Sequence, residues 1–138
     1  MASVHREIVV EDRPERVWDA IRDIGALHTR LVPGFVTDCR LDGDARIVTF
    51  GNGMVVREPI VDLNEQTRRL VWSTDGGSLT HYNASVQVFA ESAGRSRVVW
   101  IADLLPNDMA ETIAGMIEQG MGAMKRTLDA AGRAVTAG

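Results

Sequence analysis

Arg46 and Glu58 are the strongest candidates for chemistry in this sequence. They belong to two runs of alternating apolar residues that are joined by Gly51-Asn52-Gly53, a pattern that predicts a β-hairpin with a three-residue loop. In that register Arg46 lies opposite Glu58, on a face that is otherwise apolar. Such a pair can hold a carboxylate, a ketone or an ordered water, or help to move a proton.

Two interpretations of this pair remain open from the sequence. At the rim of a sheet it is an ordinary surface ion pair, which contributes roughly 0–1 kcal/mol to stability. Partly buried at one end of a pocket, it anchors a polar group of a ligand, and removing one partner costs roughly 3–5 kcal/mol.

Tyr82 and His28 complete the set of candidate catalytic residues. Tyr82, the only tyrosine, can donate a hydrogen bond to a ligand oxygen, or it can be a core residue whose hydroxyl reaches the rim. His28 has the side-chain type for general acid or base catalysis, and the alternative is a solvated histidine on a helix.

The sequence predicts no metal and no cofactor. The histidines are far apart and none has metal-ligand spacing, and no phosphate-binding or dinucleotide-binding glycine motif occurs. Cys39, the single cysteine, is expected to be an inert packed thiol. If the last hairpin were inverted, His81, Asn83 and Asp103 would form a polar cluster inside instead.

The elements that position these residues follow from the spacing of apolar side chains. One strand, Ser3–Glu11, precedes a helix that starts with the capping-box pattern of Asp12 and Glu15, and a second helical stretch covers Ile24–Leu31. Period-two alternation then predicts an antiparallel meander. Its six strands are Phe35–Leu41, Arg46–Gly51, Met54–Leu63, Arg69–Thr74, Leu79–Glu91 and Arg97–Leu104.

The last third of the chain predicts one long helix. Apolar residues return to helical spacing after Pro106, with Asn107 or Asp108 as the cap and a fraying tail from Ala134. A seven-stranded sheet needs a cover for its apolar face, and this helix is the only predicted element long enough to provide it.

Composition and charge exclude several classes of function. The 138 residues are 45% apolar and 25% charged, which suits one domain over residues 1–138. A net charge of −4 with scattered basic residues argues against nucleic-acid binding. The sequence has no apolar run of membrane-spanning length and its N-terminus has no signal-peptide pattern, so we expect a cytoplasmic protein.

Several spaced residues resemble a known superfamily along essentially the whole chain. They are Pro14-Glu15-Arg16-Val17-Trp18, Leu27 to Pro33 with Phe35-Val36, and the positions Arg46, Glu58, Tyr82 and Trp100. The sequence is similar to the START/SRPBCC helix-grip superfamily, and within it to the polyketide cyclase/dehydrase and lipid-transport group. This resemblance implies an α+β helix-grip fold, in which a curved seven-stranded antiparallel sheet, two short helices and a long C-terminal helix enclose a cavity.

The implied function is binding of a small hydrophobic or aromatic molecule, lipid-like or polyketide-like, in that cavity. The alternative is an enzyme of the cyclase/dehydrase type that uses polar cavity residues to polarise a carbonyl or transfer a proton. With strand alternation and helical spacing, we predict a ligand-binding set. It consists of Val48, Phe50, Val56, Trp72, Tyr82, Trp100, Ile113, Met116, Ile117, Gly120, Met121 and Met124.

Two features of the predicted surfaces have a second interpretation. The methionines of the long helix suit a wall that repacks around different guests, but they are equally ordinary core residues. On the outer face of the sheet, Val55, Val61, Val99 and Ile101 are expected to form an exposed apolar strip that could support a homodimer.

Overall fold

The computed structural model describes residues 1–75 and 77–137. Within them the chain forms a seven-stranded antiparallel sheet in the order β1-β7-β6-β5-β4-β3-β2. The strands are β1 (Ala2–Val10), β2 (Val36–Asp42), β3 (Ala45–Phe50), β4 (Val55–Asn64), β5 (Arg69–Ser73), β6 (His81–Ser92) and β7 (Arg95–Leu105). The predicted α+β fold and the continuous meander are therefore confirmed. One residue of the predicted Asp75-Gly76-Gly77 turn, Gly76, lies outside the described residues.

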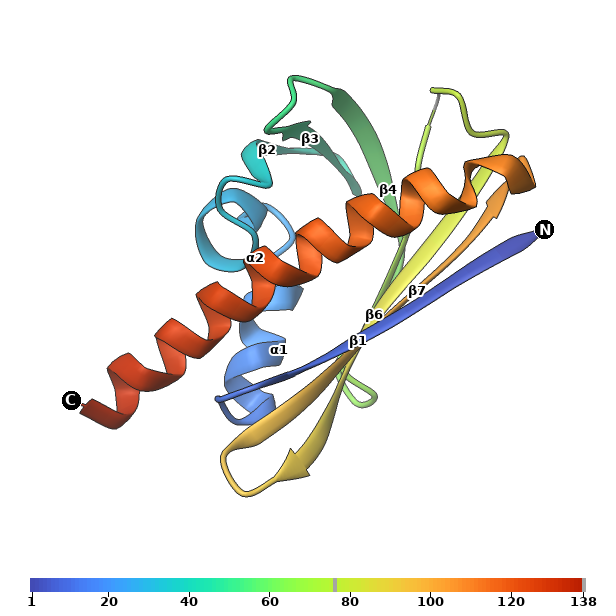
Figure 1. The fold of residues 1–138 in the computed structure, drawn as a ribbon. Helices are drawn as coiled ribbons and strands as arrows, with labels where there is room; N and C mark the ends of the chain where they lie inside the picture. The colour runs from blue at the N-terminus through green and yellow to red at the C-terminus, as the bar shows by residue number, and fades with distance from the viewer. Residues whose placement is uncertain (76, 138) are drawn as a thin grey trace.

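The sheet curves, and a long helix crosses its concave side. Figure 1 shows α2 (Ala110–Ala137) running diagonally past the strands. The short helix η1 (Leu27–Leu31) packs against α2, and α1 (Pro14–Arg22) packs against η1. The buried side chains of α2 recur at the expected helical spacing. They are Ile113, Ile117, Met121, Ala123, Met124 and Leu128.

Both predicted hairpin registers are correct. In β3–β4, Arg46 lies opposite Glu58 and Val48 opposite Val56. In β6–β7, Tyr82 lies opposite Leu104, Val86 opposite Trp100 and Ala84 opposite Ala102. The apolar face of β6–β7 therefore points inward, and the inverted arrangement that would bury His81, Asn83 and Asp103 does not occur, because His81 is exposed and the other two are half-buried.

The helix ends differ from the sequence predictions. Arg13, not Asp12, is the N-cap of α1, because the Asp12 carboxylate pairs with Arg16 and Pro14 occupies the first turn. The second helical stretch is shorter than predicted and is a π-helical turn. A short 3₁₀ turn, η2 (Asn107–Met109), precedes α2, and the helix continues through the residues expected to fray, up to Ala137.

The predicted apolar strip on the outer face is not continuous. Val55 and Val61 are exposed, but Val99 is only 8% exposed and Ile101 is half-buried. Polar and aromatic side chains of other strands, including His5 of β1, Arg69 of β5 and Phe89 of β6, surround this part of β7. The homodimer expected from this strip stays a prediction.

Candidate functional site

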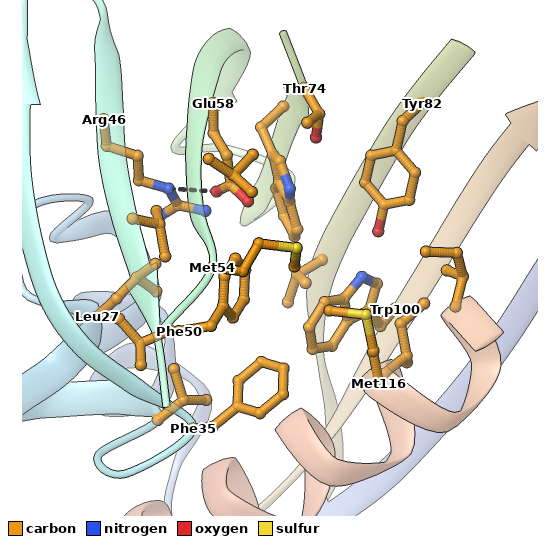
Figure 2. A pocket seen from close by; sticks show the side chains of 18 of the residues that line it. Leu27, Phe35, Arg46, Phe50, Met54, Glu58, Thr74, Tyr82, Trp100 and Met116 are labelled. Carbon is orange, nitrogen blue, oxygen red and sulfur yellow. Dashed lines mark hydrogen bonds and ion pairs between the residues drawn. The ribbon is translucent and has the colours of Figure 1, made fainter. Parts of the chain in front are cut away.

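A cavity of about 370 Å³ lies between the concave face of the sheet and α2. Its walls are contributed by α1, η1, strands β2 to β7, η2 and α2, so almost every element of the fold takes part. Exposed residues of the β3–β4 and β5–β6 loops, among them Asn52, Met54 and Ser78, belong to the lining and form its rim. Figure 2 shows aromatic and methionine side chains pointing into this space, with the Arg46–Glu58 pair at one side.

Most of the predicted ligand-binding residues face this cavity. Those in the lining are Val48, Phe50, Val56, Trp72, Tyr82, Trp100, Ile113, Met116, Ile117 and Met124. Of the candidate catalytic residues, Arg46, Glu58 and Tyr82 also line it, whereas His28 does not. Alternation along the strands and the stripe on the helix found these positions because both patterns depend on local geometry.

Gly120 and Met121 lie outside the lining. A Cβ atom on Gly120 would be 3.1 Å from the rings of both Phe35 and Trp100, so the glycine lets two wall residues pack directly against the helix. Met121 is buried at 3% exposure in the hydrophobic core cluster rather than beside the cavity.

The lining includes residues that the sequence analysis missed. The largest group comes from the segment between α1 and β3 and from η2. These residues are Leu27, Leu31, Val32, Phe35, Val36 and Met109. Of these residues, only Phe35 could have been recognised in the sequence, because it is a large apolar residue directly after the Pro33-Gly34 turn. In the structure its ring packs edge-on against Phe50, with 5.4 Å between the ring centroids.

The Arg46–Glu58 pair is buried, which excludes the first of its two interpretations, a surface ion pair. The side chains are 3% and 9% exposed, and Nε of Arg46 donates a hydrogen bond of 2.8 Å to Oε1 of Glu58. The Arg46 guanidinium also lies 5.2 Å from the ring centroid of Trp72 and makes a long contact of 3.5 Å to the carbonyl oxygen of Ile24. The pair is not a surface ion pair at the sheet rim.

Burial and charge set the protonation behaviour of the polar residues. Burial raises the pKa of the Glu58 carboxyl, and the positive charge of Arg46 opposes that shift. Burial also raises the pKa of the Tyr82 hydroxyl far above its ordinary value, and the charge of Glu58 adds to the shift. Tyr82 therefore stays a hydrogen-bond donor over the whole physiological pH range.

A second donor lies beside Tyr82. In Figure 2 the hydroxyl of Tyr82 points toward the indole nitrogen of Trp100. The indole N–H of Trp100 lies near the Tyr82 oxygen and slightly offsets the rise in its pKa, but Nε1 of Trp100 makes no full hydrogen bond to it. Among the described residues, Nε1 of Trp100 has no hydrogen-bond partner although it is buried. A buried donor without a partner is costly, so an acceptor at this point is favourable.

The remaining candidates are placed away from this chemistry. His28 lies on η1, where its Nδ1 is buried and has no hydrogen-bond partner among the described residues. Burial raises the pKa of the Cys39 thiol, as expected for an inert cysteine, and the charge of Arg46 partly opposes this. Within residues 1–75 and 77–137 no group of acidic, histidine or cysteine side chains could hold a metal ion.

This arrangement combines an apolar enclosure with a few polar groups at fixed positions. Such a site can bind an organic molecule and orient one or two of its oxygen atoms.

No helix of the described residues is long and apolar enough to cross a membrane.

Comparison with known proteins agrees with this geometry. Residues 1–129 match the family described as "Polyketide cyclase / dehydrase and lipid transport". The chain belongs to this family. A search of curated proteins found no match.

Solved structures place the fold of this family member in the START/SRPBCC helix-grip class. XoxI from Bacillus cereus has 20% identity and a TM-score of 0.83, covering 93% of this chain and 96% of its own. A START superfamily protein from Mycobacterium smegmatis has 11% identity and a TM-score of 0.75, covering 96% and 98%. The di-domain ARO/CYC BexL from the BE-7585A biosynthetic pathway has 11% identity and a TM-score of 0.81, covering 94% of this chain and 47% of BexL.

Proposed function

We propose that this protein binds a small hydrophobic or aromatic molecule in the cavity between the sheet and α2. The observation that carries the proposal is the cavity of about 370 Å³ whose walls are mainly apolar and aromatic side chains. Membership of a family described by polyketide cyclases, dehydrases and lipid transport supports it.

The size of the cavity supports an occupant. At about 24 cal/mol per Å³, an apolar void of this volume would destabilise the fold by on the order of 9 kcal/mol if nothing filled it. The net stability of a domain is only about 5–15 kcal/mol. A guest, or water at the polar side, offsets much of that cost.

A neutral fluorescent probe, N-phenyl-1-naphthylamine, tests the proposal. We expect saturable binding at one probe per chain, with increased probe fluorescence. Val56→Phe should weaken binding because Val56 lines the cavity, whereas the neighbouring Val55 is 61% exposed and Val55→Phe should leave it unchanged. Absence of saturable binding, or equal loss in both variants, would contradict a role for the cavity.

A second candidate function is catalysis of the cyclase/dehydrase type. It is favoured by the presence of Arg46, Glu58 and Tyr82 in one apolar enclosure, where fixed donors can polarise a carbonyl and a carboxylate can accept a proton. The fold similarity to BexL is consistent with it. Turnover of a polyketone substrate that is lost in Tyr82→Phe, with retained probe binding, would distinguish this enzyme from a binding protein.

A further inference from the structure

The charges of the cavity cancel. Among the described lining residues, Arg46 and Glu58 are the only ones with a charged side chain, and they pair with each other at 2.8 Å. An anionic guest would have to compete with Glu58 for the guanidinium and would lie close to its negative charge. In a buried site such a like-charge contact is strongly unfavourable.

Glu58 nevertheless keeps hydrogen-bonding capacity for a guest. Its Oε1 accepts from Nε of Arg46, and no other hydrogen bond to this carboxylate is made by the described residues. An ionised carboxyl group has about four acceptor positions on its two oxygens. Because Glu58 lines the cavity, the unused positions suit a hydroxyl donor on a bound molecule.

On the β6–β7 side the cavity offers hydrogen-bond donors, so there the guest must supply an acceptor. The Tyr82 hydroxyl and the indole N–H of Trp100 converge there, and Nε1 of Trp100 has no partner among the described residues. Two donors at one place suit an acceptor oxygen, such as a carbonyl or the oxygen of a hydroxyl group. Both rings, with Trp72 packed edge-on to Trp100 at 5.8 Å between centroids, also present aromatic surface to the guest.

We infer that the guest is an uncharged aromatic molecule that carries a hydroxyl group, and that the Arg46–Glu58 pair selects against carboxylates and other anions. This inference rests on the proposed function, since it names the class of molecule that the cavity takes. Glu58 is then a specificity-determining residue: it occupies the arginine that would otherwise bind an anion, and it accepts a hydrogen bond from the hydroxyl group of the guest.

Three compounds of the same ring size test this inference by displacement of N-phenyl-1-naphthylamine at neutral pH. They are 2-naphthol, 2-methylnaphthalene and 2-naphthoate. We expect 2-naphthol to bind roughly 10-fold to 100-fold more tightly than the other two, the range expected for a hydrogen bond to a charged group. Tyr82→Phe should weaken 2-naphthol binding but leave 2-methylnaphthalene binding unchanged.

Glu58→Gln gives the sharpest result, because it releases Arg46. This variant should bind 2-naphthoate at least about tenfold more tightly than the unmodified protein and bind 2-naphthol more weakly. Asp12→Asn is the matched control. It changes another buried carboxylate that is paired with an arginine, Arg16, but lies outside the cavity lining, so the order of the three compounds should not change.

Each outcome separates the two proposals. If the probe binds but 2-naphthoate competes as well as 2-naphthol, or if a folded Glu58→Gln variant keeps the original order, the inference is wrong and the binding function stands. If Glu58→Gln does not fold, the order of the compounds in the unmodified protein and in Tyr82→Phe decides. If the probe does not bind at all, both proposals are wrong.

Discussion

Among the described residues, two buried carboxylates, Asp12 and Glu58, pair with an arginine, and the two differ in how completely their hydrogen-bond acceptor positions are used. Both oxygens of Asp12 accept from Nε of Arg16, at 3.1 and 2.9 Å, and Oδ1 also accepts from the backbone N–H of Arg13. Arg16 makes a further contact of 3.4 Å to the carbonyl oxygen of Ala131 on α2. Glu58 accepts only from Arg46 among the described residues.

This difference separates a pair that joins two elements of the fold from one that faces a cavity. The Asp12–Arg16 pair ties the start of α1 to the C-terminal part of α2, and its polar atoms are occupied by the protein itself. The Arg46–Glu58 pair lies in the wall of a cavity and leaves acceptor positions unused. Burial is similar at the two carboxylates, so burial alone does not identify the pair that faces the cavity.

The largest expected effect is the loss of stability when the arginine of the Arg46–Glu58 pair is removed, compared with the same change in the Asp12–Arg16 pair. Arg46→Met leaves the carboxyl of Glu58 buried without its partner and should lower the free energy of unfolding by about 3–5 kcal/mol. Arg16 is 34% exposed, so water screens the Asp12 pair, and Arg16→Met should cost on the order of 1 kcal/mol. Urea denaturation of the two variants measures both values. Equal losses would show that the pairs play the same structural role.

The pH dependence of anion binding should give an intermediate effect. Burial raises the pKa of Glu58 above its ordinary value of 4.5, with Arg46 opposing the shift. As the pH falls through this raised pKa, Glu58 takes up a proton and the charge of Arg46 is no longer compensated. The affinity for 2-naphthalenesulfonate, which stays ionised, should therefore increase by up to about tenfold per pH unit in that range.

Other titratable groups around Glu58 do not interfere in acid. Burial raises the pKa values of Tyr82 and Cys39, which moves both groups away from this range. Glu58→Gln should bind the sulfonate tightly at every pH, without the acid-dependent increase. An unmodified protein whose sulfonate affinity falls in acid would break the proposed difference between the two pairs.

The smallest expected effects on stability and binding come from replacing glycines on α2. Gly115 and Gly120 compare a position in open space with one that packs against the cavity wall. Gly115→Ala places its Cβ in open space and should stabilise the helix by about 0.5–1 kcal/mol. Gly120→Ala forces the rings of Phe35 and Trp100 to move, since both lie 3.1 Å from the new atom. That strain should cancel the gain in helix propensity and weaken probe binding. Thermal unfolding and probe titration of both variants check this, and equal stabilisation with unchanged binding would contradict it.

The sequence by itself determined the strands and their pairing. The loop Gly51-Asn52-Gly53 set Arg46 opposite Glu58, and the spacing of the last two strands set Tyr82 and Trp100 on the inner face. These features depend on a short turn and on the alternation of side chains, and both are local properties of the chain.

Only the tertiary structure decided the depth and the composition of the cavity. Leu27, Phe35 and Met109 join its wall because η1, the following turn and η2 pack against distant elements, and no local pattern fixes those distances. The same packing buried the Arg46–Glu58 pair and brought the rings of Phe35 and Trp100 close to Gly120. In the folded protein the Asp12 carboxylate pairs with Arg16 and does not cap α1. Burial depends on contacts between residues far apart in the sequence, and a local pattern contains no information about those contacts.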